Sequence, residues 1–239
     1  FLLFYIGTLP VQGKITLPAI LSDNMVLQQK AQVRFWGKAR PGEKVTVSTS
    51  WDKNIYTVQT PTDGHWEVKI KTPGVMDNQT LTVKGENTIT IHNILIGEVW
   101  LCTGQSNMEF PVARDPNVKW KTGILNETEE MKDADYPSIR LFHVEHQLAP
   151  EGEKEDCIGR WLVCTPENVK EFSAVGFIFG RKLYKELQMP VGLIQSTWGG
   201  THAESWTERR VMKDNPLYAD VMEEFAPQNV KREKDKCKV

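Results

Sequence analysis

A serine placed just beyond a strand-like run is the residue of this chain best suited to chemistry. Ser106 comes two residues after Gly104, which closes an apolar run over residues 99–103. A strand that ends in such a turn lifts a hydroxyl beyond the edge where open α/β sheets bind ligands. Met108 stands where the nucleophile elbow Gly-x-Ser-x-Gly needs its second glycine. Ser106 is therefore predicted to be a nucleophile of another design, or else a turn serine that caps the next segment.

A glycine pair after a second apolar run could supply oxyanion donors. Gly199 and Gly200 follow the β-forming residues 191–196. Glycine lets a backbone approach a ligand closely, and backbone N–H groups at such a turn can stabilise a developing oxyanion. The alternative is a tight strand-to-helix turn that binds nothing.

The segment around Ser106 resembles a known family of carbohydrate esterases. Gly-Gln-Ser-Asn-Met at residues 104–108, preceded by Gly-Glu-Val-Trp-Leu-Cys, resembles the first block of the sialate O-acetylesterases, which belong to the SGNH-hydrolase superfamily. The resemblance covers residues 15–212. Further parts that resemble the family in the same order are residues 23–28, 172–176, 191–194, 198–201 and Trp206.

The resemblance implies a serine esterase that needs no metal ion and no organic cofactor. Ser106 would be the catalytic nucleophile, and the backbone N–H groups of Ser106 and Gly200 would form the oxyanion hole. Trp198 and Trp206 could stack on sugar rings or pack in the core. The residues expected to bind substrate are Gln105, Asn107, Trp198, Thr201 and His202.

The motif that carries the general base in the resembled family is absent from this sequence. The family carries it in an Asp-x-x-His pair near the C-terminus and adds an amide donor from a Trp-Gln-Gly-Glu-like block, and this sequence contains neither. We therefore expect that the chain ends before the triad is complete. One alternative is a non-catalytic carbohydrate-binding protein or pseudoenzyme. Another is an esterase that uses His143 or His202 of this chain as its base.

Other ionisable side chains near the serine receive no role from the sequence. His143 and His146 are three residues apart in a strand-like run, so they are expected on opposite faces of a strand, which argues against a shared metal site. Glu109 and Asp115 lie close to Ser106 in sequence, but no spacing rule makes them catalytic.

Turn signals and alternation predict an all-β domain over residues 14–96. Short β-forming runs separated by Gly, Pro, Asn and Asp are typical of an antiparallel β-sandwich. Thr62-Asp63-Gly64 is predicted to be a hairpin loop. Residues 88–91 are expected to form the last strand of this domain.

The pattern over residues 97–239 predicts an α/β domain. Apolar runs at 99–103, 139–144 and 191–196 and a helix over 172–187 give the order strand, crossover, helix, strand. The resemblance implies that this is the N-terminal part of an SGNH-type three-layer α/β hydrolase domain with a parallel sheet.

The net charge and the N-terminal residues indicate which partners and which compartment to expect for this protein. A net charge of −2 gives no electrostatic reason to expect nucleic acid or an acidic membrane surface as a partner. Residues 1–13 look like the remnant of a secretory signal peptide, too short to span a bilayer, or alternatively a buried first strand. We expect a protein that is secreted or exported to a periplasmic or lysosomal-type compartment, where Cys157 and Cys164 could form a disulfide.

These observations predict a hydrolase that acts on an acetylated carbohydrate. The resemblance suggests O-acetyl groups of sialic acid as the substrate, with acetylated xylan or another glycan as the alternative. We expect no membrane insertion of the mature form, and the sequence does not indicate an oligomeric state.

Overall fold

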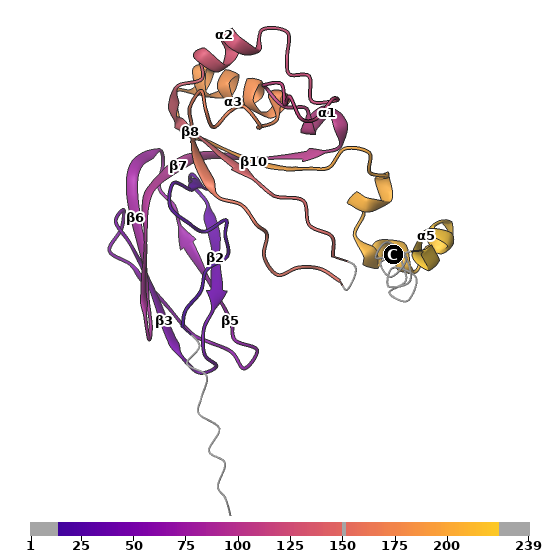
Figure 1. Cartoon of the computed structure of the whole chain (residues 1–239). Helices are drawn as coiled ribbons and strands as arrows, with labels where there is room; N and C mark the ends of the chain where they lie inside the picture. Colours follow the sequence, from indigo (N-terminus) through magenta and orange to yellow (C-terminus); the bar gives the residue numbers. More distant parts are fainter. Residues whose placement is uncertain (1–13, 150–151, 225–239) are drawn as a thin grey trace, which may run out of the picture. The chain divides into compact units, whose positions relative to one another are not determined.

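The computed structural model describes residues 14–149 and 152–224, which divide into two compact units. The first unit extends to Glu98 and the second begins at Val99 (Figure 1). The chain is a mixed α/β structure in which antiparallel strand pairs predominate and the pairs β1–β7 and β8–β10 are parallel. The predicted signal remnant at residues 1–13 lies outside the described residues.

Short strands with alternating burial form the first unit. In β5 (His65–Lys71), Trp66, Val68 and Ile70 are buried while the residues between them are exposed, as the period of two along a strand requires. β4, β3, β6 and β7 form one sheet with β1 added beside β7, and β2 pairs with β5 in another. The remaining strands of this unit are β1 (Val26–Gln28), β2 (Gln32–Lys38), β3 (Lys44–Thr49), β4 (Ile55–Gln59), β6 (Met76–Lys84) and β7 (Thr88–Gly104), which from Val99 onward belongs to the second unit.

The hairpin predicted at residues 62–64 is wrong. β4 pairs with β3, and β5 pairs with β2, so this turn carries the chain from one sheet to the other. Gly64 has a φ of +79° and accepts a hydrogen bond from the N–H of Ala39 at 3.0 Å. A turn signal reports a local reversal of the chain, whereas the pairing of the strands depends on distant residues.

The separate strands predicted at residues 88–91 and 99–103 are parts of one strand. β7 runs for 17 residues, from Thr88 to Gly104. Its irregularity falls at Asn93, which has a φ of +55°, where the register with β6 shifts. A bulge at this position therefore shifts the register without ending the strand.

Parallel pairing organises the strands of the second unit. β10 (Val191–Thr197) pairs in parallel with β8 (Tyr136–His143), and the sheet order places β10 between β7 and β8. The predicted order of strand, helix and parallel strand is thereby confirmed. β9 (Trp161–Cys164), which pairs antiparallel with β8, was not predicted, because four residues are too few to show a periodic pattern.

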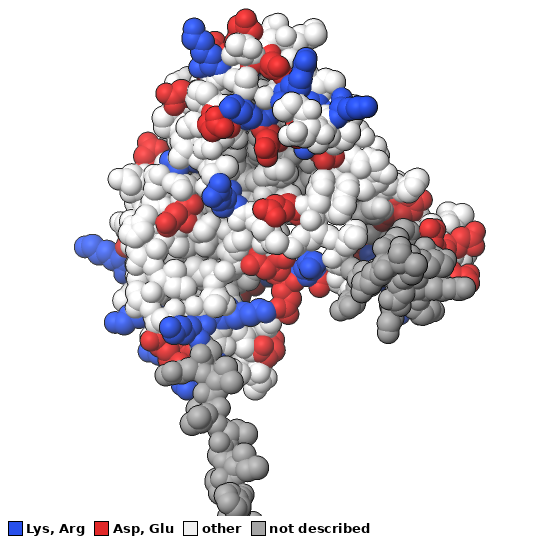
Figure 2. Space-filling model, in the orientation of Figure 1, with Lys and Arg blue, Asp and Glu red and all other residues white. Residues whose placement is uncertain are grey.

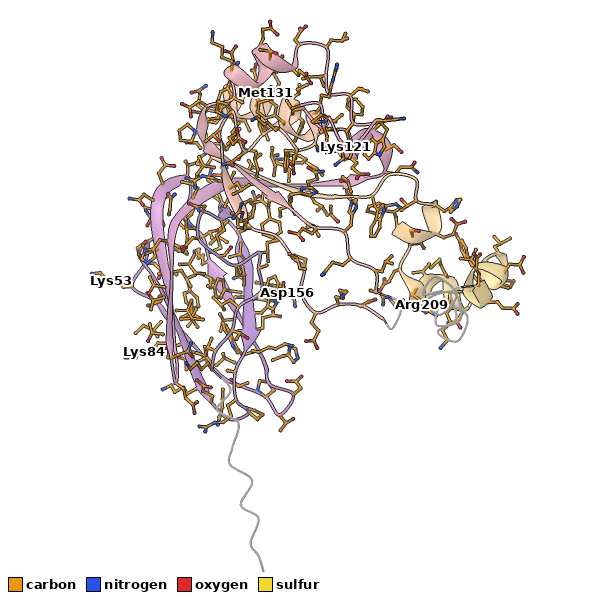
Figure 3. The ribbon with its side chains drawn as sticks, in the orientation of Figure 1. Lys53, Lys84, Lys121, Met131, Asp156 and Arg209 are labelled. Atoms are coloured by element: carbon orange, nitrogen blue, oxygen red, sulfur yellow. The ribbon has the colours of Figure 1, made fainter. Side chains whose placement is uncertain are left out.

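One long helix covers a face of β8 and β10 (Figure 1). α3 (Ala174–Leu187) begins after Ser173, whose hydroxyl accepts the Gly176 N–H at 3.0 Å, so the predicted helix start is confirmed. Met131, which is labelled in Figure 3, lies on α2 and packs against the buried core of this unit. The other helices are α1 (Ser106–Glu109), α2 (Glu127–Lys132), η1 (Ala203–Trp206), α4 (Arg209–Lys213), η2 (Pro216–Tyr218) and α5 (Ala219–Glu224).

The disulfide considered between Cys157 and Cys164 is not formed. Both residues are free thiols, as is Cys102. Cys164 is buried on β9 and its thiol lies 3.5 Å from the carbonyl oxygen of Ala134. Burial raises the pKa of Cys164 to about 12. Cys237 lies outside the described residues.

A valine at Gly180 is expected to destabilise the second unit. A Cβ at this position would lie 2.9 Å from Cδ2 of the fully buried Leu193 and closer still to Cδ1. Overpacking of this kind costs about 1–3 kcal/mol, so the free energy of unfolding in urea should fall by that amount for Gly180→Val. Val175→Ala, at an exposed position of the same helix, is the control and should change it by less than about 0.5 kcal/mol. Equal stability of the two variants would contradict the close approach of α3 to β10.

Alkylation should distinguish the described cysteines. The thiolate is the reactive form, and burial raises the pKa of all three described thiols, so access of the reagent decides the order among them. We expect iodoacetamide at pH 8 to modify the partly exposed Cys157 first, and Cys102 and Cys164 only after unfolding. Peptide mass analysis of the native and denatured protein checks this order. Resistance of both Cys157 and Cys164 in denatured, unreduced protein would show that a disulfide joins them after all.

Candidate active site

Ser106 lies at the start of α1, immediately beyond the end of β7. Gly104 has a φ of +148°, a conformation that residues with a side chain rarely adopt, and it allows the chain to turn sharply here. Ser106 itself is exposed. The position predicted from the sequence, a serine at a strand-to-turn junction, is therefore the position that the structure gives it. We call residues 104–109 the serine turn.

The residues that follow β10 lie against the serine turn. We call residues 198–201 the glycine turn. The Trp198 N–H donates to the Gly104 carbonyl at 3.0 Å. The side-chain amide of Gln105 donates to the Thr201 carbonyl at 3.2 Å, across 96 residues of sequence. The two segments that were predicted to carry the nucleophile and the oxyanion donor are thus brought together by hydrogen bonds.

Gly199 lies against Ser106 and Glu109, the first and last residues of α1. Its N–H donates to Oε2 of Glu109, which is buried. A Cβ on Gly199 would lie 2.7 Å from that oxygen and 3.4 Å from the Ser106 hydroxyl. Only glycine fits here without displacing a neighbour. Glu109 received no role from the sequence, although its place three residues after Ser106 would set both side chains on one side of a helical turn.

The N–H groups expected to form the oxyanion hole have no partner among the described residues. Neither the backbone N–H of Ser106 nor that of Gly200 donates to another residue of the described chain. Gly200 has a φ of +74° and open space around the position of a Cβ. Both N–H groups are therefore free to donate to a ligand oxygen, whereas the Gly199 N–H already donates to Glu109.

His146 joins the site from β8. The strand ends at His143, so His146 lies in the loop beyond it, and the prediction that the two histidines occupy opposite faces of one strand is wrong. The imidazole of His146 stacks on Trp198, with ring centroids 4.2 Å apart and planes inclined by 5°. Its Nε2 lies 2.6 Å from the Thr197 carbonyl oxygen and 3.6 Å from Oε1 of Glu109.

His143 faces a separate cavity. Burial lowers its pKa, and the nearby His146 and Lys121 act in the same direction, so the imidazole is neutral at pH 7. The cavity has a volume of about 330 Å³, and neither Ser106 nor the glycine turn lines it. Its lining residues are Leu141, His143, Arg160, Leu162, Glu167, Asn168, Lys170, Glu171 and Phe172.

The tryptophans predicted near the substrate differ in their surroundings. Trp206 is 41% exposed, and its Nε1 donates to the Thr201 hydroxyl at 2.8 Å. It is therefore not a core residue. Trp198 is half-buried and covered on one face by His146. Of the other predicted substrate-binding residues, Gln105, Asn107 and His202 are exposed.

The described residues contain neither a cluster of metal-binding side chains nor a helix that could span a membrane. Within residues 14–149 and 152–224, no three His, Cys, Asp or Glu side chains are placed to hold a metal ion. No helix in these ranges is long and apolar enough to cross a membrane. Acidic and basic side chains are interspersed on the face shown in Figure 2.

Comparison with known proteins relates the chain to esterases of carbohydrates. The family described as carbohydrate esterase, sialic acid-specific acetylesterase, matches residues 96–236, more than half of the chain. The sialate O-acetylesterases of Pongo abelii and Homo sapiens are 38% and 37% identical over 214 residues. These alignments cover 81% of this chain and 39% of each relative, so the chain spans about two fifths of the length of these relatives.

A solved structure extends the likeness to the fold. The crystal structure of a carbohydrate acetylesterase from Xanthomonas citri matches with a TM-score of 0.74 and 30% identity, over 84% of this chain and 44% of that one. The residues matched by the family include both the serine turn and the glycine turn. The chain therefore belongs to the carbohydrate esterase family of sialic acid-specific acetylesterases.

Proposed function

We propose that this protein is a carbohydrate O-acetylesterase that hydrolyses acetyl esters on sugars with Ser106 as its nucleophile. The observation that carries the proposal is the meeting of the two turns. An exposed serine hydroxyl lies beside a turn whose Gly200 N–H has no partner among the described residues. Family membership supports the same chemistry.

The proposed reaction follows the course of a serine esterase. The Ser106 hydroxyl attacks the acetyl carbonyl carbon and loses its proton to a base, and the N–H groups of Ser106 and Gly200 bind the resulting oxyanion. Collapse of the tetrahedral intermediate breaks the ester C–O bond, and the departing sugar oxygen takes the proton. Water then attacks the acetyl-enzyme, which releases acetate and restores Ser106.

The base in this proposal is a histidine that these 239 residues do not include. In the described chain no histidine hydrogen-bonds to the Ser106 hydroxyl, and Nε2 of His146 is directed to the Thr197 carbonyl. The resemblance to the sialate O-acetylesterases implies an Asp-x-x-His pair, which the sequence lacks. His143 and His202 are the alternatives within the chain.

The finer architecture belongs to the same proposal. We infer that the first unit is an antiparallel β-sandwich, which its division into two sheets supports. The second unit would be the N-terminal part of a three-layer SGNH-type hydrolase domain, supported by a mixed sheet with α3 on one face. Export to a secretory, periplasmic or lysosomal-type compartment remains our expectation from residues 1–13.

The proposed substrate is an acetylated sugar, with O-acetylated sialic acid as the first choice. The names of the relatives support this choice, and the more general name of the Xanthomonas citri enzyme supports acetylated carbohydrates as a class. Trp206, exposed beside the glycine turn, offers an aromatic face on which a sugar ring could stack.

Loss of the Ser106 hydroxyl should abolish hydrolysis. We expect Ser106→Ala to lower kcat/KM of the full-length gene product by at least about 10³-fold, since attack on the ester needs this oxygen. The substrates are 4-nitrophenyl acetate, O-acetylated sialic acid and acetylated xylan, and the last two rank the sugar preference. The control is Ser48→Ala, at an exposed position of β3, which should leave activity unchanged.

Two results would change the proposal. Ser106-dependent activity in the 239-residue chain by itself would place the base within this chain. A folded full-length protein with no Ser106-dependent activity on any of the three substrates would instead favour a carbohydrate-binding protein.

A further inference from the structure

We propose that Glu109 is a positioning residue that holds the glycine turn against Ser106, so that the Gly200 N–H is fixed as an oxyanion donor. The inference rests on the esterase function proposed above. It assigns a role to a buried carboxylate that the reaction itself does not use. Its structural part, the contact between Glu109 and Gly199, can be tested independently of activity.

The surroundings of Glu109 point to a specific task. A carboxylate is seldom buried unless it is paired or hydrogen-bonded, because desolvation of the charge costs free energy. Glu109 is 8% exposed, and its Oε2 accepts the Gly199 N–H. Hydrogen bonds from N–H groups to an ionised carboxylate are stronger than neutral ones. The carboxylate therefore acts as a fixed anchor for the backbone of the glycine turn.

The position of the anchor links the nucleophile to the donor. Ser106 and Glu109 are the first and last residues of the single turn α1, so their side chains are held in one short rigid element. The position of a Cβ on Gly199 lies 3.4 Å from the Ser106 hydroxyl. By binding Gly199, Glu109 sets the distance between the serine and the turn that faces it.

The anchor also selects which N–H remains for the substrate. The Gly199 N–H is engaged by Glu109, whereas the Gly200 N–H has no partner in the described chain. Gly200 is attached on both sides, at Gly199 by Glu109 and at Thr201 by the amide of Gln105. A donor fixed before the reaction stabilises the oxyanion without reorganisation during the reaction.

The role requires an acceptor oxygen at the right reach; the negative charge strengthens this hydrogen bond but does not itself assist the reaction. A carboxylate close to a developing oxyanion would repel it. A glutamine at position 109 keeps the reach and the acceptor but loses the charge. An aspartate keeps the charge but is shorter by one methylene, so that its oxygen no longer reaches Gly199. The two variants therefore separate positioning from electrostatics.

The kinetic test compares Glu109→Gln with Glu109→Asp in the full-length gene product. We expect Glu109→Asp to lower kcat by about 10- to 100-fold, because misplacing one oxyanion donor has effects of this order or larger. KM should change by less than about threefold, since the oxyanion exists only in the transition state. Glu109→Gln should keep kcat within about fivefold of the wild-type value. Glu186→Asp, at an exposed residue of α3 that pairs with Lys182, is the matched control and should have no effect.

The structural test measures hydrogen exchange of the Gly199 amide by NMR in the same proteins. Exchange should be slow in the wild-type protein and in Glu109→Gln and fast in Glu109→Asp, whose folding is checked by urea unfolding. Unchanged exchange in Glu109→Asp would overturn the inference even if the variant were inactive. A loss of kcat in Glu109→Gln as large as that in Glu109→Asp would also overturn it, since an acceptor oxygen at the right reach would then not be sufficient.

The outcomes also separate this inference from the proposed function. If the wild-type protein shows Ser106-dependent activity and Glu109→Asp has the same kcat as the wild type, the positioning role alone is overturned. A wild-type protein without Ser106-dependent hydrolysis would overturn the esterase proposal, and the positioning role would fall with it, whatever the exchange of Gly199.

Discussion

The candidate site depends on the carboxyl ends of β7 and β10 lying at one edge of a sheet. The hydrogen bond from the Trp198 N–H to the Gly104 carbonyl fixes this meeting, and β8 runs parallel to β10 and ends at the same edge. Because the ends of parallel strands converge in this way, three loops that are distant in sequence contribute to one surface. Without this pairing, Ser106 would be an ordinary turn serine.

Close approach of the two turns then dictates what the residues between them can be. Gly199 has room for no side chain between Ser106 and Glu109. The approach also buries the carboxylate of Glu109, whose Oε2 accepts the Gly199 N–H and whose Oε1 lies 3.6 Å from His146. Burial of a charge is unfavourable unless such partners surround it. The polar groups of this edge therefore depend on one another, and a change at one of them affects the others.

Local pattern was sufficient to place Ser106 at a strand end and to predict several elements, and insufficient to predict their partners. Ser106 at a strand end, the start of α3 at Ser173 and the parallel strand β10 follow from residue types within a few positions. The hairpin at residues 62–64 was wrong because strand pairing is decided by distant contacts. Glu109 was missed for the same reason, since its partner Gly199 is 90 residues away.

In the proposed reaction, the exposed Ser106 would suit a small acyl group carried by a large glycan. Ser106 lies at an open edge, and the cavity of about 330 Å³ against β8 does not include it. An acetyl group needs little volume, while the sugar that bears it must remain partly outside. Recognition of the sugar would then rest on side chains at the rim, of which Trp206 is the most exposed aromatic one beside the glycine turn. In this proposal, the paired turns would hold the acetyl group while exposed side chains such as Trp206 contact the sugar.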